Sequence, residues 1–461
     1  MARQVIDVSK VVETQTRRRF LWTVVGLCSL IVLLDGYELT VLAFAAPYIQ
    51  RALDVPMSDF TSIFSLGPIG NIIGGILFGY LGDRIGRRRS LAIAVVCYSF
   101  LSLLMGFATS IPEFLVLRLL TGAAVGGLMP VLWTLVIEYS PSRWRVTMLT
   151  IVMCAYVGGH ASVGFVSAVL VPIFDWRFLF WFGAVAPMIV LVPQLLFLPE
   201  SVQYLASRGT EKHRIAKILK RINPDIEIGP ETVFIVSDGG ESTGLATRGQ
   251  KFHIRLLFAG KLKWITPLLW ISFICTTATV FFFSWAPLLA EAAGISSKAT
   301  AIGMSAFQIG GIIGSLVLAR ALDKRGPIAI VILPLLAAPL VVGLGSLGNL
   351  TDTAFYVLMF ATGCMVLGGH HGLQAIIGLF YPTSYRSTGA GWAYGVGRIG
   401  SVVGPLVAGI LLARGWSVTH VFPIVAMPLL IFAAAIFLVS AIQKRADPRT
   451  PWAGDGDRAQ A

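Results

Sequence analysis

The chain has 461 residues, of which 56% are hydrophobic and 13% are charged, whereas about 25% are charged in a typical soluble domain. Its mean hydropathy of +0.79 excludes a soluble enzyme of ordinary composition and indicates membrane helices of about 20 residues each. The net charge of +13 does not indicate nucleic-acid binding, because the basic residues lie in short connections between apolar segments. The five cysteines all lie in apolar segments and lack metal-ligand spacing.

The apolar segments in the first half of the chain predict six membrane spans. A basic N-terminal tail, residues 1–19, precedes them. The first apolar segment follows three arginines, as in a signal peptide, but it lacks a cleavage site and is long enough to span. The half runs from 20 to 198, with expected spans at 20–43, 61–81, 90–109, 112–137, 147–171 and 178–198.

The first expected span contains two acidic residues, Asp35 and Glu38. They are three residues apart and therefore share one face of the helix. Placing a lone carboxylate in a membrane costs several kcal/mol of free energy, so such residues are usually protonated, paired or functional. We expect this pair to bind the coupling proton. The alternative is a structural pair held by an arginine of another helix.

The connection between the second and third spans reads "GYLGDRIGRRR", from Gly79 to Arg89. Its glycines allow close helix packing and a tight turn. Its arginines anchor the loop at the cytoplasmic face, which is the simpler interpretation. Charge contacts of Asp83, Arg84 and Arg87 would also break and form as this face opens, so we predict a gating role for them.

The two halves are joined by a polar linker, residues 199–263. It contains basic residues and the segment "SDGGESTG", and it predicts one short amphipathic helix but too few apolar residues for a domain. The second half runs from 264 to 441, and a C-terminal tail follows it from 442 to 461. Its expected spans are 264–288, 299–321, 328–348, 353–380, 389–412 and 420–441.

The distribution of basic residues predicts the orientation. With the N-terminus in the cytoplasm, the outer connections hold only Arg51, Arg177, Lys298 and Arg414. Two further arginines lie within spans, and the other 30 of the 36 basic residues are cytoplasmic. Both termini are therefore expected inside the cell.

An internal repeat supports two halves of six spans. The segment "GGILFGYLGDRIG" from Gly74 has a weaker copy, "GSLVLARALDKRG", from Gly314, at an offset of 240 residues. The offset matches Asp83 to Asp323, so Asp323 is a further expected gating residue. Duplicated bundles of this kind place the substrate site between the halves, near the membrane midplane.

The second half supplies candidate substrate contacts. Arg398 and Arg118 are the only cations well inside spans. A guanidinium suits a substrate carboxylate, so we assign this role to Arg398, with pairing to Asp35 or Glu38 as the alternative. Arg118 serves either as a charge relay or as a structural residue. Arg386, just beyond the tenth span, is expected at the cytoplasmic gate.

Ligand cavities usually have flat apolar walls with a few polar groups. Trp285 and Tyr394 are the preferred wall residues, although each also fits ordinary core packing. His370 and His371 in the tenth span are expected to line the cavity, where a histidine donates hydrogen bonds or moves protons. A packed histidine with no such role is the alternative.

The motif from Gly79 to Arg89 resembles the signature loop of the major facilitator superfamily. "LDGYE" from Leu34, "RLLTGAAVGGLMP" from Arg118, "EYSPSRWR" from Glu138 and "LPES" from Leu198 narrow the resemblance. With "DWR" from Asp175 and "GLFYPTSYRSTGAGWAYGVGRIGSVVGP" from Gly378, they resemble the aromatic acid:proton symporter family over nearly all spans. The family usually has aspartate at the position of Glu38 and often glutamine near His370 and His371.

The resemblance implies an all-α membrane protein with twelve transmembrane helices, and it adds Glu138 and Arg143 to the expected gating residues. It also implies proton-coupled import of a hydroxybenzoate-like acid by alternating access, in a bacterial inner membrane. The expected partners are the aromatic acid, protons and the lipid bilayer, with no nucleic acid, and the protein is expected to be a monomer.

The sequence weighs against other functions. No GxxxxGK[ST] segment is present, so no cofactor or nucleotide is expected and the proton gradient supplies the energy. An enzyme is not expected, since neither a nucleophile-base set nor metal-ligand spacing occurs. A drug efflux antiporter would usually carry a Gly-Pro motif in the fifth span, and the fifth span expected here has none. A sugar porter usually carries a characteristic motif directly after the sixth span, and only half of that motif is present here.

Overall fold

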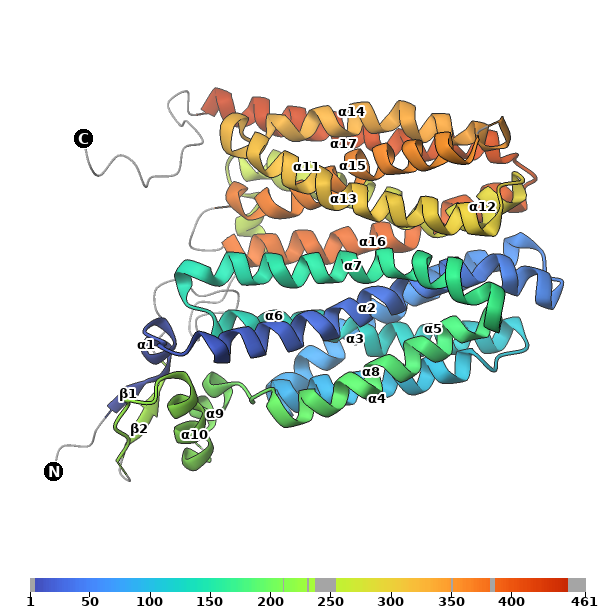
Figure 1. Ribbon diagram of the computed structural model, residues 1–461. Helices are drawn as coiled ribbons and strands as arrows, with labels where there is room; N and C mark the ends of the chain where they lie inside the picture. The colour runs from blue at the N-terminus through green and yellow to red at the C-terminus, as the bar shows by residue number, and fades with distance from the viewer. Residues whose placement is uncertain are drawn as a thin grey trace. The chain divides into compact units, whose positions relative to one another are not determined.

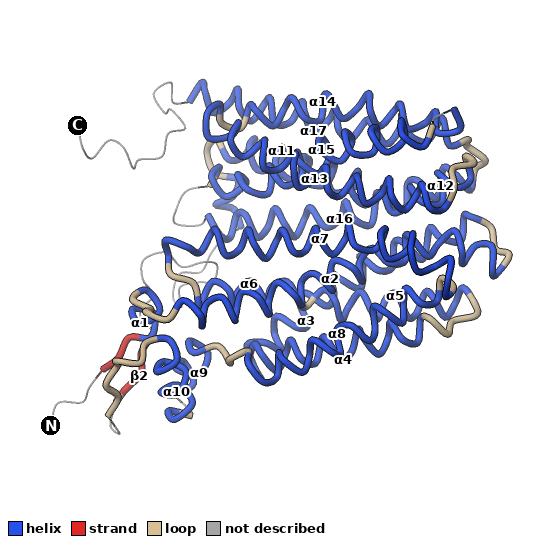
Figure 2. The backbone as a smooth tube through the Cα atoms, in the orientation of Figure 1, coloured by secondary structure: helices blue, strands red, loops and turns tan. Residues whose placement is uncertain are grey.

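The computed structural model describes residues 5–209, 211–229, 232–236, 254–349, 351–381 and 386–446. Helices make up almost all of this part of the chain, with two short strands near one end (Figure 2). The elements of the first half are β1 (Val5–Asp7), α1 (Val8–Glu13), α2 (Arg18–Leu53), η1 (Met57–Asp59), α3 (Phe60–Ile85), α4 (Arg87–Met105), α5 (Ile111–Gly126), α6 (Leu128–Tyr139), α7 (Ser142–Phe174) and α8 (Arg177–Phe197).

The remaining elements follow in chain order (Figure 1). They are α9 (Val202–Arg208), α10 (Lys212–Ile222), β2 (Val233–Ile235), η2 (Ile254–Phe258), α11 (Leu262–Phe282), η3 (Phe283–Trp285), α12 (Ala286–Ala292), α13 (Ser297–Arg325), α14 (Ile328–Gly343), η4 (Leu344–Asn349), α15 (Asp352–Ile376), η5 (Ile377–Phe380), α16 (Arg386–Ala413) and α17 (Val418–Ala446).

Twelve helical segments among the described residues are long and apolar enough to cross a membrane. This confirms the predicted number of spans. Two of the segments are interrupted. The span Ile111–Tyr139 breaks between α5 and α6 at Gly127, and the span Leu262–Ala292 passes through the 3₁₀ turn η3. At Gly127 a larger residue would collide with the Phe78 side chain of α3, so the break coincides with a close helix contact.

Contacts between residues divide the chain into two compact units. Unit 1 contains the described parts of Met1–Val41, Ile69–His160 and Arg177–Ser242. Unit 2 contains those of Leu42–Pro68, Ala161–Trp176 and Thr243–Ala461. The far ends of α2 and α7 and the beginning of α3 therefore belong to the same unit as helices α11 to α17.

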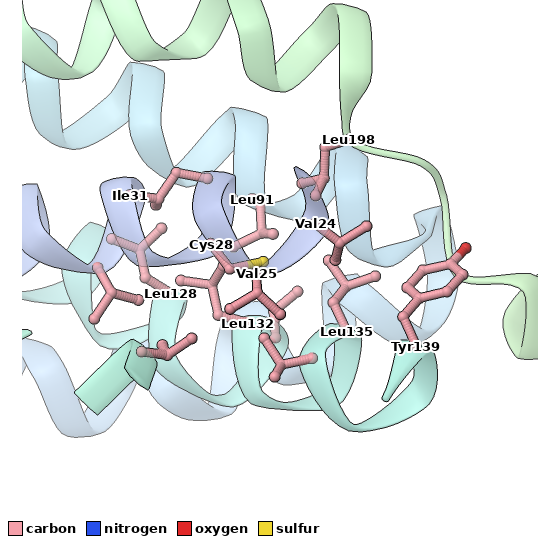
Figure 3. Close-up of a cluster of buried hydrophobic side chains, with 14 of the residues drawn as sticks. Val24, Val25, Cys28, Ile31, Leu91, Leu128, Leu132, Leu135, Tyr139 and Leu198 are labelled. Atoms are coloured by element: carbon pink, nitrogen blue, oxygen red, sulfur yellow. The ribbon is translucent and has the colours of Figure 1, made fainter. Parts of the chain in front are cut away.

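The core of unit 1 forms where α2 packs against α6. Val25 and Cys28 of α2 lie beside Leu128 and Leu132 of α6 (Figure 3), and none of the four side chains is more than 1% exposed. Residues separated by about one helical turn along each helix meet in this way because they project from the same face. This packing holds the helix that carries the two acidic residues.

The N-terminal tail and the linker fold together at one end of unit 1. Strand β1 pairs in parallel with β2, with Val5 opposite Val233. Helix α1 packs against both α9 and α10, where it buries Val8 and Val12. The sequence predicted one amphipathic helix in the linker, whereas the described part of the linker contains two α-helices, α9 and α10.

Glycines set the spacing of the helices in unit 2. Gly310 and Gly314 of α13 face the carbonyl oxygens of Phe360 and Cys364 in α15 so closely that a Cβ atom would not fit. Small residues four apart allow membrane helices to approach in this way. Gly400 and Gly404 of α16 are packed in the same manner against α11.

Unit 1 repeats this arrangement at the predicted offset. Gly70 and Gly74 of α3 lie against the carbonyl oxygens of Leu119 and Ala123 in α5. These two glycines precede Gly310 and Gly314 by the same 240 residues that relate the repeated motifs. The internal repeat therefore extends from the sequence motif to the helix contact that it supports.

Candidate functional site

The acidic pair of α2 lies inside unit 1. Asp35 is 2% exposed and Glu38 is 0% exposed. The Ser102 hydroxyl of α4 donates a hydrogen bond of 2.9 Å to Glu38 Oε2. Gly183 of α8 leaves room for this carboxyl, since a Cβ atom there would lie 2.8 Å from Glu38 Oε2. Both side chains are thus buried, as their place in the first span predicts.

Arg118 of α5 is the cation that interacts with this pair inside unit 1. It is 7% exposed, and its guanidinium interacts electrostatically with Glu38. Its Nη2 donates a hydrogen bond of 3.0 Å to the carbonyl oxygen of Leu39, the residue after Glu38. An arginine that contacts the acidic helix in this way fits both roles expected for it, charge relay and structural support.

The same region contains several buried polar atoms that form no hydrogen bond within the described part of the chain. They are Asp35 Oδ1, Glu38 Oε1, Tyr98 OH and Arg118 Nε. The Tyr98 phenol of α4 interacts electrostatically with Asp35 and Glu38. Buried polar groups normally find partners or ordered water, so this cluster has unused capacity to bind water or exchange protons.

Sequence reasoning missed Tyr98 and Ser102. Both lie in a span with other hydroxyl residues, and such residues commonly bond to their own helix. Only the packing of α4 against α2 places these two beside the acids.

In unit 2 the structure brings His370 and Tyr394 together around Gln374. His370 Nε2 lies 2.9 Å from Gln374 Nε2, and the Tyr394 hydroxyl donates a hydrogen bond of 2.9 Å to the Gln374 carbonyl oxygen. The Phe273 ring of α11 is 5.7 Å from the His370 ring and 5.2 Å from the Tyr394 ring. Helices α11, α15 and α16 thereby form a cluster with aromatic faces and polar edges.

The neighbouring histidine points to another helix. His371 Nδ1 lies 2.8 Å from the Ser315 hydroxyl of α13, and the two histidine rings are 5.6 Å apart. His370 Nδ1 is buried and has no hydrogen-bond partner among the described residues. His370 therefore has more capacity for a new hydrogen bond than a fully satisfied packing histidine.

Arg398 lies in α16, four residues after Tyr394, and so projects near the same helix face. It is half-buried, and its carbonyl oxygen accepts a hydrogen bond of 2.6 Å from Ser401. Trp285 is fully buried, and its Nε1 donates a hydrogen bond of 3.1 Å to the Pro405 carbonyl oxygen. The indole also packs edge-on against Phe64, which favours a packing role for Trp285 over ligand contact.

The expected gating residues of the first half meet at one end of unit 1. Arg87 Nη2 lies 3.2 Å from Asp83 Oδ1, and Arg87 Nε lies 3.9 Å from Glu138 Oε1. Arg84 stacks over the Tyr80 ring at 4.6 Å. Between these residues Gly86 adopts a φ of +100°, a conformation that glycine tolerates best. The tight α3–α4 turn therefore places the charges of the motif against the end of α6.

Glu200 at the start of the linker is a partner that sequence reasoning missed. It is 5% exposed, and its Oε1 accepts hydrogen bonds from the backbone N–H groups of Arg88 and Ser201 at 3.0 and 3.1 Å. A carboxylate at the start of α4 also suits the positive end of the helix dipole. The Tyr139 hydroxyl donates to the Glu200 carbonyl oxygen, which joins the α6 end to the same linker residue.

The other three expected gating residues are less informative. Arg143 is exposed in the first turn of α7. The side chains of Asp323 and Arg386 lie outside the described residues.

A second contact network in unit 2 joins the far ends of the early helices to the later ones. Arg51 of α2 forms an ion pair of 2.9 Å with Glu291 of α12. The Ser305 hydroxyl of α13 donates a hydrogen bond of 2.8 Å to the Ala161 carbonyl oxygen of α7. Gly409 of α16 approaches Thr61 of α3 so closely that a Cβ atom would not fit. These contacts tie α2, α3 and α7 to the helices of the second half at this end.

Residues 28–369 match the Major Facilitator Superfamily. The chain belongs to the Major Facilitator Superfamily. It is 33% identical to the gallate transporter of Pseudomonas putida over 96% of this chain and 97% of that protein. It is 31% identical to the 4-hydroxybenzoate transporter PcaK of Acinetobacter baylyi over 95% of both chains. These relatives confirm the predicted resemblance to the aromatic acid transporters of the superfamily, which are not enzymes.

The fold of this superfamily member agrees with solved structures. A bacterial homologue of the human lysosomal transporter Spinster, crystallised in an inward-facing and occupied conformation, matches with a TM-score of 0.68. The match covers 93% of this chain and 98% of that one at 14% identity, so it supports the fold alone. The protein is therefore a multi-pass membrane transporter with the superfamily's helical architecture.

Proposed function

We propose that this transporter carries an aromatic carboxylic acid of the hydroxybenzoate type into the cell together with protons, by alternating access. The observation that carries the proposal is the similarity over almost the whole chain to gallate and 4-hydroxybenzoate transporters. The buried acids of unit 1 and the aromatic cluster of unit 2 supply the two chemistries that such transport requires.

Proton coupling is assigned to Asp35 and Glu38. Two carboxyls within one turn of a buried helix segment repel each other when both are ionised, which favours a shared proton. Arg118 stabilises the ionised form of Glu38, so the pair is able to exist with and without the proton. Importing the proton with the substrate follows the inward proton gradient of a bacterial inner membrane.

The substrate carboxylate is assigned to Arg398. A planar guanidinium binds a carboxylate with two parallel hydrogen bonds, which fixes the orientation of the acid. Tyr394 lies one helical turn away, and its contacts with His370 and Phe273 provide aromatic faces and a hydrogen-bonding edge for the ring. His371, which is bonded to Ser315, and Trp285, which is packed against Phe64, are assigned supporting roles.

The two halves, 20–198 and 264–441, are the proposed moving bodies. The tails 1–19 and 442–461 and the linker 199–263 are proposed to lie in the cytoplasm. In this orientation Asp83, Arg87 and Glu138 form part of the inner gate and the Arg51–Glu291 pair forms part of the outer gate. The residues assigned to the proton and to the substrate all belong to one chain, so we propose a monomer.

An uptake screen tests the substrate class. Radiolabelled gallate, 4-hydroxybenzoate, protocatechuate and benzoate are offered to cells that express the protein and lack their own aromatic acid transporters. We expect uptake of at least one acid above the empty-vector control, and competition by unlabelled aromatic acids but not by sugars. A protein that is present in the membrane but accumulates none of these acids would contradict the proposal.

A further inference from the structure

The hydroxyl group of Ser102 stands between two acceptors. Its oxygen lies 2.9 Å from Glu38 Oε2 in α2 and 3.2 Å from the carbonyl oxygen of Phe180 in α8. A serine hydroxyl has one hydrogen to donate and two lone pairs to accept with. Ser102 therefore donates to only one of these two oxygens at a time.

The two possible arrangements match the two protonation states of Glu38. When Glu38 is ionised, Ser102 donates its hydrogen to the carboxylate. When Glu38 carries a proton, the carboxylic acid donates to the Ser102 oxygen and Ser102 turns its own hydrogen to the Phe180 carbonyl. The Ser102 hydroxyl therefore stays hydrogen-bonded to Glu38 in both states, although Glu38 and Ser102 are 0% exposed.

We propose that Glu38 is the carboxyl that gains and releases the transported proton, and that Ser102 is the positioning residue that serves it in both states. The proposal rests on the proton symport of the proposed function and assigns the proton to one of the two acids. The step is a proton transfer alone: Glu38 accepts a proton, its charge rises from −1 to 0, and the proton leaves again when the carboxylate re-forms.

In the described part of the chain, the other charged and titratable groups around Glu38 lie on four helices, one of which is α7, whose His160 is bonded to Thr40 of α2. Helix α2 contributes Asp35 and Tyr37, α4 contributes Tyr98, and α5 contributes Arg118. The Tyr37 hydroxyl is already bonded to the Leu179 carbonyl oxygen at 3.0 Å. On the α8 side, Gly183 and the Phe180 carbonyl approach the carboxyl and its serine, and neither titrates.

The arrangement of Ser102 differs from that of other buried hydroxyls in the protein. The hydroxyls of Ser65 and Ser272 donate to carbonyl oxygens four residues earlier in their own helices, which is the usual pattern in membrane helices. Ser90, also in α4 and also 0% exposed, donates to the Phe78 carbonyl oxygen at 3.2 Å. Ser102 is bonded to neighbouring helices as Ser90 is, but one of its partners is a carboxyl.

The test is infrared spectroscopy of the full-length protein, purified in detergent and titrated between acidic and alkaline pH. The infrared band of the carbonyl stretch measures how many carboxyl groups are protonated. The share of this band that is lost in Glu38→Gln belongs to Glu38. We expect Ser102→Ala to move the pH midpoint of this share upward by about one unit, a tenfold change in proton affinity, because the ionised state loses a charge-assisted hydrogen bond. Ser102→Thr keeps the hydroxyl and should restore the midpoint.

Ser90→Ala is the matched control, since it removes an equally buried, hydrogen-bonded serine hydroxyl from the same helix. It should leave the band unchanged. A midpoint in Ser102→Ala equal to that of the wild type would overturn the role of Ser102. A band that survives in Glu38→Gln and disappears in Asp35→Asn would overturn the assignment to Glu38. Neither readout requires a substrate, so a failure of the proposed aromatic acid transport is recognised separately by the uptake screen.

Discussion

At the residue scale, Arg398 is the side chain on which recognition of the acid depends in the proposed function. Arg398→Lys keeps the charge but replaces the planar fork by a point charge, so carboxylate binding should weaken by about tenfold. Arg398→Ala should weaken binding of the acid by about a hundredfold or more, since charged hydrogen bonds contribute about 1.5–3 kcal/mol each. The measurement is binding of a labelled aromatic acid to purified protein.

An uncharged analogue is the control for this residue. The amide of the same acid cannot form the ion pair, so its affinity should differ much less between wild type and Arg398→Ala. Equal binding of the acid by wild type and Arg398→Ala would mean that the carboxylate is held elsewhere.

The sequence predicted that the two acidic residues are buried in a membrane span, but it did not predict which hydroxyl groups they contact. Asp35, Glu38 and Arg118 are exceptional because each is an ionisable residue inside an apolar span, and their burial follows from that fact. Ser102 lies 64 residues from Glu38 in the chain and carries no signal that distinguishes it from other hydroxyl residues in spans. Its partner depends on how α4 packs against α2, which local pattern does not specify.

At the element scale, the N-terminal helix α1 supports the start of α7. The carboxyl of Glu13 accepts hydrogen bonds of 2.9 and 3.0 Å from the Ser142 backbone N–H, and it lies 3.9 Å from Arg145 Nη2. Glu13→Ala removes this cap and should destabilise the protein by about 1 kcal/mol, the usual cost of a lost N-terminal cap. The midpoint of thermal unfolding in detergent should therefore fall by a few degrees.

The matched control for this prediction is Lys10→Ala in the same helix, whose side chain is exposed. It should leave the midpoint unchanged. If Glu13→Ala is as stable as Lys10→Ala, the contact between α1 and α7 has no part in stability.

The ion pair between α2 and α12 is a second prediction at this scale. Arg51 is 59% exposed in its side chain and Glu291 is 15% exposed, and such a pair contributes about 0–1 kcal/mol. Each single reversal, Arg51→Glu or Glu291→Arg, should alter the uptake rate by up to about fivefold through the repulsion it creates. The double reversal restores the attraction and should return uptake toward the wild-type rate.

Uptake by the three variants, at equal amounts in the membrane, makes up a double-mutant cycle. If the effects of the single reversals simply add in the double variant, the two side chains do not interact during transport.

Long elements were predictable, and short ones were not. Each of the twelve spans has a hydropathy signal longer than about 18 residues, which is why all were found from sequence. The strands β1 and β2 have three residues each and are 228 positions apart, too short for a recognisable alternation of apolar and polar residues. Their pairing gives the N-terminal tail and the linker a shared structure that composition did not indicate.

At the scale of the whole molecule, the duplication organises both packing and charge. The glycines that contact α5 from α3 and α15 from α13 repeat at an offset of 240 residues. The residues of the ion pair, Arg51 and Glu291, are separated by the same 240 positions. Equivalent positions of the two copies therefore bear opposite charges and form an ion pair.

Proton-coupled import is the central claim for the molecule, and transport in proteoliposomes tests it most directly. The purified protein is reconstituted with an acidic exterior, a neutral interior and an external labelled aromatic acid that the uptake screen has identified. We predict accumulation above the external concentration, which collapses when an uncoupler is added and is absent in Glu38→Gln. Accumulation that continues unchanged with the uncoupler, or that is equal in wild type and Glu38→Gln, would contradict the account.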